Sequence, residues 1–588
     1  MTGMGGGNPK LDDSVVVAHF NQSLWHQMVI ITLLGFVVAA LVTYLTRRAA
    51  TAQGPEPYEP PVRRVLRIGF GCLWVIAGLL QLQPEMPIGL PTQVVAPTVA
   101  SAPAWLQHLV SIGTDAWLRH PIIAATATVW LQLGLGLWLL ASKDGWWSRA
   151  AGWASAGWAL CVWALGNGLG GFFVPPVSWM FGAPGATAYY VVAGLAIGVP
   201  VSWLERRNVA SVTARLTGVF LLLFALLQAW PGRGFWQGRV GGQPASLSAM
   251  ATTMSGASEP GILQSMVRWF ATFTLSYSWL VNLIVVVGLG FVGVVFLLKR
   301  HELLTPAVVV YVVLALADWV LVQDMAIFGG VGTDVNSMIP SAIVLVAVWR
   351  FLISSDVDEP SVSTVPSDSI SPTWRARTVV SSIFAVMFGV GAVLMVAVGV
   401  LPGASADAAI AAGSQVVPLG GPAPNFTLTN QHGTAVSLQS LRGKTVVMSF
   451  IDPVCISDCP VEAQEMAAAA SKLGNPSNVA FVAVNANPIY RSVSSIQTFN
   501  ETEGLSKVPG WMFLTGTPAE LARVWNSYGV QVELSKNGSM VTHAEPIYVI
   551  SPDGRMYSTW TVQTGSGAGS VLGSSTVALI VGQVKAAS

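Results

Sequence analysis

The chain has 588 residues, a length that would suit several soluble domains. Only 10% of the residues are charged, against roughly 25% in a soluble globular protein. Hydrophobic residues make up 53% of the chain and its mean hydropathy is +0.60, which indicates a protein embedded in a lipid bilayer. The formal net charge of +1 gives no electrostatic basis for binding nucleic acid, so that class of function is excluded.

Ten apolar segments are long enough to be candidates for crossing a hydrocarbon core of about 30 Å. They are 25–46, 66–83, 121–141, 150–171, 187–204, 213–231, 271–298, 304–323, 339–354 and 378–401. The sequence therefore predicts a polytopic α-helical membrane protein with about ten spans.

The positive charges between these segments predict the orientation, because cytoplasmic loops retain Lys and Arg. Fifteen Lys and Arg residues fall on one side, and five fall on the other before residue 402. We therefore expect the N-terminus and the C-terminal region on the extracytoplasmic side of a bacterial-type cytoplasmic membrane. The first span has no basic cluster before it, so we interpret it as an anchor rather than a cleaved signal peptide.

Spans two to five resemble spans six to nine. Span two ends in Gln81-Leu82-Gln83-Pro84 and span six in Gln228-Ala229-Trp230-Pro231. Asn167 and Gln323 lie at matching places near the ends of spans four and eight. The sequence thus predicts two parallel four-helix repeats, each of which resembles the DoxX/DoxD-like four-helix membrane proteins.

These patterns divide the chain as follows. We expect an exported segment 1–24, an anchor span 25–48, four-helix units 63–204 and 205–354, a cytoplasmic linker 355–376, a tenth span 377–402, a second linker 403–423 and an α/β domain 424–588.

Asp318 lies inside the eighth predicted span. A carboxylate at membrane depth is a candidate functional site, because burying its charge in lipid is costly. The alternative is a structural ion pair with Arg268, which starts the preceding span at the same level.

The residue pattern changes after residue 424. Predicted strands at 445–451, 479–485, 511–514 and 546–550 alternate with predicted helices that end near 473 and span 492–503 and 517–528. Alternating strands and helices with short loops predict a layered α/β domain, whose size and cysteine placement fit a thioredoxin-like fold.

Cys455 and Cys459 lie between the first of these strands and its helix. The amide groups at a helix start favour thiolates there, and a spacing of four places both sulfur atoms on one face of a helical turn. Such a pair can close a disulfide or hold a soft ion such as Cu(I). In contrast, Cys72 and Cys161 stand alone inside apolar segments, where we expect them to be inert buried residues.

The C-terminal domain resembles the Sco/SenC family of copper chaperones for cytochrome oxidase. The resemblance covers roughly 424–588 and rests on spaced motifs: Cys455-x-x-x-Cys459-Pro460, 511–516, Glu520-Leu521, 528–530 and His543-x-x-x-Ile547-Tyr548-x-x-x-Pro552-Asp553-Gly554. It implies that Cys455, Cys459 and His543 bind copper. The chain departs from the family pattern at Ile456, Thr542 and 485–488, changes that could alter copper affinity, redox poise or choice of partner.

Three functions follow from these residues and the resemblance. The first is a membrane-anchored copper-binding protein that metallates the binuclear copper site of a terminal cytochrome oxidase, or reduces its thiols. The second is an extracytoplasmic thiol–disulfide oxidoreductase that uses Cys455 and Cys459 without metal. The third is an accessory subunit of a respiratory complex. The expected partners are the lipid bilayer and the copper-bearing oxidase subunit or another respiratory complex.

Overall fold

A computed structural model describes the following residues: 14–48, 59–99, 102–143, 145–174, 176–204, 206–254, 261–325, 327, 331–356, 372–400, 416–455, 458–474, 476–534, 541–543, 545–561 and 574–588. The chain folds into two compact units, and each is described by itself below. One is built from residues 25–114 and 125–396, and the other contains residues 397–588.

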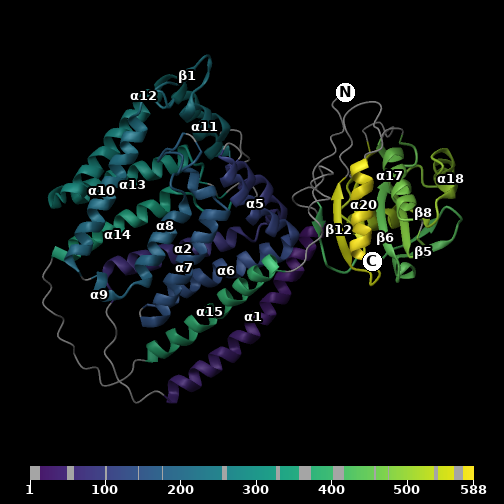
Figure 1. Cartoon of the computed structure of the whole chain (residues 1–588), viewed down its shortest axis with the longest axis horizontal. Helices are drawn as coiled ribbons and strands as arrows, with labels where there is room; N and C mark the ends of the chain where they lie inside the picture. Colours follow the sequence, from purple (N-terminus) through teal and green to yellow (C-terminus); the bar gives the residue numbers. More distant parts are fainter. Residues whose placement is uncertain are drawn as a thin grey trace. The chain divides into compact units, whose positions relative to one another are not determined.

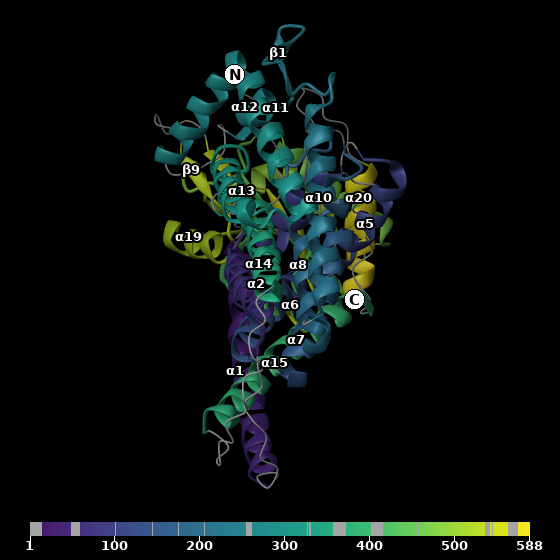
Figure 2. The same ribbon diagram turned by 90° about the vertical axis from the view of Figure 1, so that its left-hand side faces the viewer.

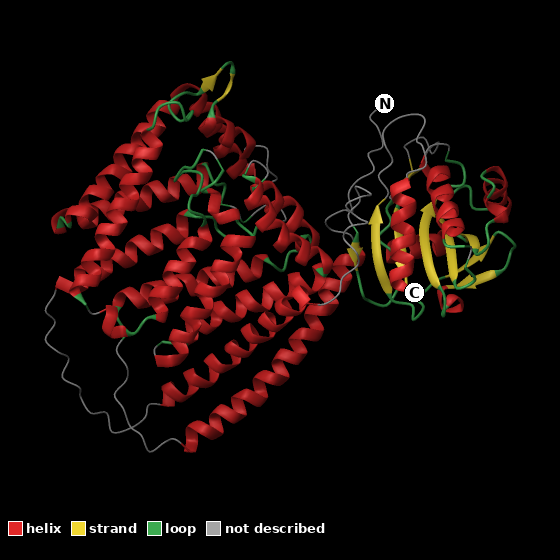
Figure 3. Ribbon diagram, in the orientation of Figure 1, coloured by secondary structure: helices red, strands yellow, loops and turns green. Residues whose placement is uncertain are grey.

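The first unit is almost entirely helical (Figures 1 and 3). Every predicted span corresponds to a helix: α1 (Ser14–Arg48), α2 (Pro61–Leu80), α6 (Pro121–Ala141), α7 (Gly145–Leu165), α8 (Ala186–Gly198), α10 (Arg207–Ala229), α12 (Gly261–Leu298), α13 (His301–Leu321), α14 (Met338–Asp356) and α15 (Pro372–Val400). Shorter helices between them include α5 (Ala104–Arg119) and α11 (Ser246–Met254).

Six of these helices contain segments that are long and apolar enough to cross a membrane. The segments are Phe20–Thr46, Pro121–Ala141, Asn208–Ala229, Gly261–Leu298, His301–Leu321 and Ala376–Val400. Their outer faces expose large apolar side chains, such as Leu226 at 65% and Val287 at 60%, which suit lipid rather than water. The protein is therefore a multi-pass membrane protein with at least these six candidate spans.

The other predicted spans differ from these six in length or charge. Helix α8 has 13 residues and so extends about 20 Å, which is less than the hydrocarbon core of about 30 Å. Helix α2 contains buried arginines: Arg63 donates to Ser148, and Arg67 forms a 2.6 Å ion pair with Glu59. Glu59 compensates the charge of the buried Arg67, and Ser148 provides a hydrogen-bond acceptor for the buried Arg63.

Glycines bring pairs of helices into close contact. A Cβ on Gly136 of α6 would lie 2.7 Å from the backbone oxygen of Gly71 in α2. Likewise, a Cβ on Gly293 of α12 would lie 3.1 Å from the backbone oxygen of Gly218 in α10. Gly71 precedes Gln81 by ten residues and Gly218 precedes Gln228 by ten, so both contacts fall at matching places in the two predicted four-helix units.

Buried polar side chains bond to one another near the ends of these helices. Gln228 is fully buried, accepts a 2.6 Å hydrogen bond from Ser178 and donates a 2.8 Å bond to Asn282. Each amide group thereby keeps a partner where water is excluded. Helices α10, α12 and α13, which carry or adjoin this network, can be followed in Figure 2.

Asp318 belongs to a second buried polar group. Its Oδ2 accepts a 3.1 Å hydrogen bond from Gln323, while its Oδ1 has no hydrogen-bond partner among the described residues. The expected ion pair with Arg268 is wrong, because the Arg268 side chain is exposed and Gln323 occupies the position beside the carboxylate. A role of Asp318 in function stays a prediction.

The second unit contains an eight-stranded mixed sheet in the order β3-β12-β11-β6-β7-β8-β4-β5. The strands are β3 (Val417–Pro418), β4 (Thr427–Asn430), β5 (Ala435–Ser437), β6 (Thr445–Ile451), β7 (Val479–Asn485), β8 (Trp511–Thr515), β11 (Pro546–Ile550) and β12 (Met556–Thr561). Strands β6, β7 and β8 are parallel, and β11 is antiparallel to β6.

Helices cover both faces of this sheet, which explains why β6 and β7 are continuous apolar runs rather than alternating ones. Helices α17 (Asp458–Lys472), α18 (Val493–Thr502) and α20 (Ser574–Ala587) share one core with inward side chains such as Val447 and Phe481. On the other face, Phe450 packs against Tyr528 and Tyr548, next to α19 (Pro518–Ser527). Figure 3 shows these helices lying against the strands.

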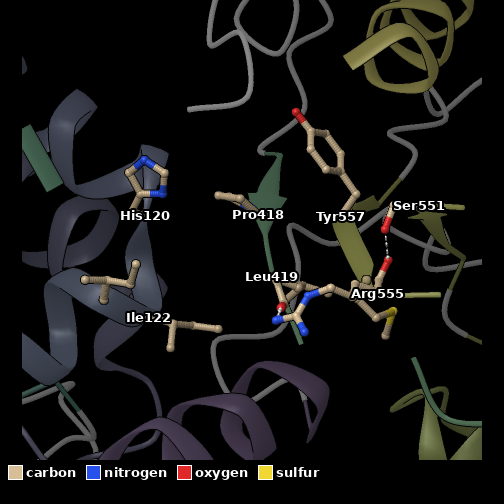
Figure 4. A pocket seen from close by; sticks show the side chains of 10 residues that line it. His120, Ile122, Pro418, Leu419, Ser551, Arg555 and Tyr557 are labelled. Carbon is tan, nitrogen blue, oxygen red and sulfur yellow. Dashed lines mark hydrogen bonds between the residues drawn. The ribbon is translucent and has the colours of Figure 1, made fainter. Parts of the chain in front are cut away.

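The sheet begins before residue 424. Leu419 donates a backbone hydrogen bond of 3.1 Å to Tyr557, and Arg555 reaches the backbone oxygen of Gly420 beside the turn at Ser551 (Figure 4). The end of the segment expected to be a linker, 403–423, thus contributes an edge strand. Residues 401–415 and most of the linker expected at 355–376 lie outside the described residues.

The glycine contacts lead to a prediction about stability. We expect Gly218→Ala to destabilise the helical unit by about 1–3 kcal/mol, because the new methyl group would lie 2.5 Å from the Leu297 backbone nitrogen. Gly290→Ala, in α12, is the matched control because no atom lies within 4 Å of its added Cβ. Thermal unfolding of the full chain in detergent would test this, and equal melting temperatures for the two variants would contradict it.

Candidate metal centre

Two cysteines follow β6: Cys455 lies in the loop before α17, and Cys459 lies at the start of α17. After β6 ends at Ile451, the buried Asp452 accepts a 3.0 Å hydrogen bond from the amide of Val454, and the amide of Cys455 bonds to the Asp452 backbone oxygen. Cys455 is partly exposed, and Cys459 is buried in the first turn of α17. The turn at Asp452 thus determines the path of the backbone from β6 to Cys455.

A second loop holds this turn in place. Asn487 follows β7 and donates a 2.9 Å hydrogen bond to the Asp452 carboxylate. Its own side-chain oxygen accepts bonds from the amides of Ile489 and Tyr490. Asn487 lies in the segment where the sequence departs from the Sco/SenC pattern. Its hydrogen bond to Asp452 connects the loop after β7 to the loop after β6 that carries Cys455.

A histidine and a glutamate reach Cys459 from the segment just before β11: His543 ends β10 (Val541–His543), and Glu545 directly precedes β11. Cys459 Sγ lies 3.5 Å from His543 Nε2 and 4.0 Å from Glu545 Oε1. One ligand atom from each of these three residues lies within 4.8 Å of the others. Since β11 runs antiparallel to β6, the residues just before β11 lie beside those just after β6.

The pKa of the Cys459 thiol is not lowered, contrary to the expectation from its place at a helix start. The pKa of its thiol is raised well above the ordinary value by a hydrogen bond with Cys455, then by burial, and then by the charges of Cys455 and Glu545. A backbone hydrogen bond at Asp452 acts in the opposite direction. The expectation from the helix start is therefore wrong for Cys459, because neighbouring acidic groups and burial outweigh the favourable amides.

A buried glutamate lies close enough to Cys455 to be affected by its charge. Glu462 is fully buried in α17, accepts a hydrogen bond from Ser449, and has no partner for Oε2 among the described residues. Burial raises the pKa of Glu462 well above 4.5, and the charge of Glu545 raises it further. Glu462 and Glu545 could not be singled out from the sequence, because neither is a specified position of a motif.

The other cysteines do not join this group. Cys72 in α2 and Cys161 in α7 are free and exposed, so the expectation that they are buried is wrong. Both lie on helices whose outer faces are largely apolar.

Comparison with known families concerns the C-terminal unit. The SCO1/SenC family model matches residues 421–570. These residues are an SCO1/SenC domain. The match includes the four residues described above around the centre: Cys455, Cys459, His543 and Glu545.

Curated relatives also support the SCO1/SenC domain. The SCO1 protein homolog of Bacillus subtilis is 28% identical over 134 residues, which cover 22% of this chain and 69% of the relative. The mitochondrial Protein SCO1 homolog 1 of Arabidopsis thaliana is 31% identical over 140 residues, which cover 23% of this chain and 40% of that protein.

Solved structures match the same part. Bradyrhizobium japonicum ScoI with copper bound has 24% identity and a TM-score of 0.24, covering 28% of this chain and 99% of that chain. Yeast Sco1 with copper bound has 20% identity and the same TM-score of 0.24, covering 28% of this chain and 89% of that chain. The resemblance of the helical unit to DoxX/DoxD-like proteins stays a prediction.

The hydrogen bond between Asn487 and Asp452 leads to a first prediction about the SCO1/SenC domain. We expect Asn487→Ala to lower its free energy of unfolding by about 1–3 kcal/mol, because the substitution leaves buried polar groups of the cysteine loop unpaired. Reaction of Cys455 with a thiol reagent should also become faster. Asn526→Ala, at an exposed position in α19, is the control, and equal rates in both variants would refute the role of Asn487.

Glu462 leads to a prediction about pH. Above pH 4.5 the carboxyl group ionises in the unfolded chain but stays protonated in the folded domain, so its contribution to stability falls as pH rises toward the folded pKa. We expect Glu462→Gln to remove this fall, measured as amide hydrogen exchange of α17 between about pH 5 and about pH 8. Glu520→Gln serves as the control, since the pKa of that exposed group is lowered. An unchanged pH profile in Glu462→Gln would contradict the prediction.

Proposed function

We propose that the SCO1/SenC domain binds copper through Cys455, Cys459 and His543, and that it serves a terminal cytochrome oxidase. The observation that carries this proposal is the 3.5 Å approach of Cys459 Sγ to His543 Nε2 across 84 residues of sequence. Thiolate sulfur selects Cu(I), and imidazole nitrogen is also a good copper ligand.

The donor set fits a copper ion. Cys459, His543 and Glu545 place three ligand atoms within 4.8 Å of one another, and Cys455 acts on the Cys459 thiol through a hydrogen bond. Bound copper would replace the thiol proton of Cys459, since thiolates are the metal ligands.

The surface beside the centre suits a protein acceptor. Val454 is 45% exposed, Ile489 51% and Tyr490 50%, and the loops that carry them are joined by the bond between Asn487 and Asp452. Exposed apolar side chains beside a partly exposed thiol are typical of a surface that meets another protein. We propose that this partner is the copper-bearing subunit of the oxidase, or another respiratory complex.

We further propose ten spans in two parallel four-helix units, with the SCO1/SenC domain on the extracytoplasmic side. The distribution of Lys and Arg supports this orientation. The matching glycine contacts of Gly71 with Gly136 and of Gly218 with Gly293 support the repeat. The units would anchor the copper domain at the membrane where the oxidase is assembled.

A second candidate function is thiol–disulfide exchange. It is favoured by the hydrogen bond through which Cys455 acts on the Cys459 thiol, since exchange needs an attacking and a resolving thiol. His543 separates the two functions, because metal binding requires it and simple exchange does not.

The copper proposal is tested with the full chain, purified in detergent under reducing conditions. We expect one tightly held copper per chain, lost in Cys455→Ala/Cys459→Ala and strongly weakened in His543→Ala. Cys72→Ala/Cys161→Ala is the matched control and should retain the metal. Absence of copper in the unmodified chain, together with a reversible disulfide between Cys455 and Cys459, would instead establish exchange chemistry.

A further inference from the structure

Positive charge gathers at one edge of the sheet in the C-terminal unit. Strands β6, β7 and β8 are parallel, so all three begin at the same edge, opposite the metal centre that follows the end of β6. Among the described residues, six exposed Lys and Arg side chains lie at or beside this edge, and we call them the basic edge: Arg442, Lys444, Lys472, Lys507, Arg555 and Lys585.

Three connections to the parallel strands supply four of these cations. Arg442 and Lys444 directly precede β6, and Lys507 precedes β8. Helix α17 starts beside the metal centre and leads back to the beginning of β7, with Lys472 in its last turn. The crossover from each strand to the next therefore returns a basic residue to the same edge.

The other two cations come from the last part of the chain. The Thr445 hydroxyl, at the start of β6, is hydrogen-bonded at 2.7 Å to the hydroxyl of Ser588, just after α20, whose last turn carries Lys585. Arg555 follows the turn after β11, where Gly443 donates a 2.9 Å backbone bond to Pro552. Tertiary packing thus adds both residues to the basic edge.

Acidic side chains do not neutralise this edge. Within the described part of the chain, none of the six basic side chains forms an ion pair with a carboxylate. The acidic side chains on this edge are Asp553, Glu501 and Glu503, half as many as the basic ones. A lysine in the last turn of a helix also offsets the helix dipole, but Lys444 and Arg555 lie outside helices. The basic edge therefore fits an anionic partner.

The bilayer is an anionic surface that this unit cannot leave. Helix α15 ends at Val400 and β3 begins at Val417, so the segment between them spans at most about 50 Å. Such a tether keeps the unit at a high effective concentration beside the membrane. Lys and Arg side chains near a surface of anionic lipid are attracted to it, and their contributions accumulate.

We propose that the basic edge binds the anionic phospholipid headgroups of the membrane in which the chain is embedded. The metal centre lies at the opposite edge of the sheet, so this contact turns the centre away from the lipid and toward the aqueous phase. Lipid binding would thereby present Cys455 to a partner protein. The proposal does not depend on which metal or which chemistry the centre supports.

The test uses the full chain in lipid nanodiscs, made either of phosphatidylcholine alone or of phosphatidylcholine mixed with anionic phosphatidylglycerol. Limited acetylation followed by mass spectrometry measures the reaction rates of Lys444, Lys472, Lys507 and Lys585. We expect these lysines to react about threefold to tenfold more slowly in the anionic nanodiscs. High salt should abolish the difference, because ions screen the attraction.

Charge reversal at two lysines locates the contact. In Lys472→Glu/Lys585→Glu, we expect Lys444 and Lys507 to lose most of their protection in the anionic nanodiscs. Arg491→Glu/Arg523→Glu is the matched control, since it changes the net charge equally at exposed positions outside the basic edge. The control should keep the protection of the lysines.

Three results would overturn the proposal. Equal reaction rates in the two kinds of nanodisc would show that the basic edge does not meet lipid. Slow reaction in both lipids, insensitive to salt, would assign the edge to a protein surface instead. An equal loss of protection in both double variants would assign the attraction to net charge rather than to this edge. Copper binding is measured separately, and none of these results bears on it.

Discussion

The antiparallel pairing of β11 with β6 is the constraint on which the candidate centre depends. It joins Tyr548 to Met448 and Val549 to Val447 in the middle of the sheet. Because the strands run in opposite directions, the beginning of β11 lies at the end of β6. Cysteines that follow one strand and a histidine that precedes the other are thereby brought together, although 84 residues separate Cys459 from His543.

The same arrangement concentrates acidic groups. Cys455, Cys459, Glu462 and Glu545 influence one another, and burial of Cys459 and Glu462 removes the water that would screen them. Well-packed strands and the bond between Asn487 and Asp452 hold these groups together. Burial raises the pKa of Glu462 and contributes to the raised pKa of Cys459, which favours the uncharged forms of both groups.

Different physics governs the helical unit. Between helices in lipid the hydrophobic effect gives little attraction, so close backbone packing and buried hydrogen bonds become important. The glycine contact of Gly218 with Gly293 and the bond of Gln228 with Asn282 provide both. The contact of Gly71 with Gly136 shows the same close backbone packing between α2 and α6.

Local pattern in the sequence was sufficient for much of the fold. Apolar runs located the helices, the strands at 445–451, 479–485 and 546–550 have the predicted bounds, and α19 (Pro518–Ser527) lies within the helix predicted at 517–528. Spaced motifs also led to the SCO1/SenC domain that the family comparison shows. These features depend on neighbouring residues and on the spacing of apolar residues, both of which can be read from the sequence.

Contacts between residues that are far apart in the sequence could be found only from the tertiary structure. The motifs include neither Glu545 nor Asn487 as a named position, and only strand register and loop packing bring these residues to Cys459 and Asp452. The raised pKa of Cys459 and the partner of Asp318 were likewise decided by burial and by neighbouring side chains. The sequence by itself determined the elements and the ligand types, whereas the electrostatic environment of the centre follows from how the chain packs, because charge interactions depend on distances in space.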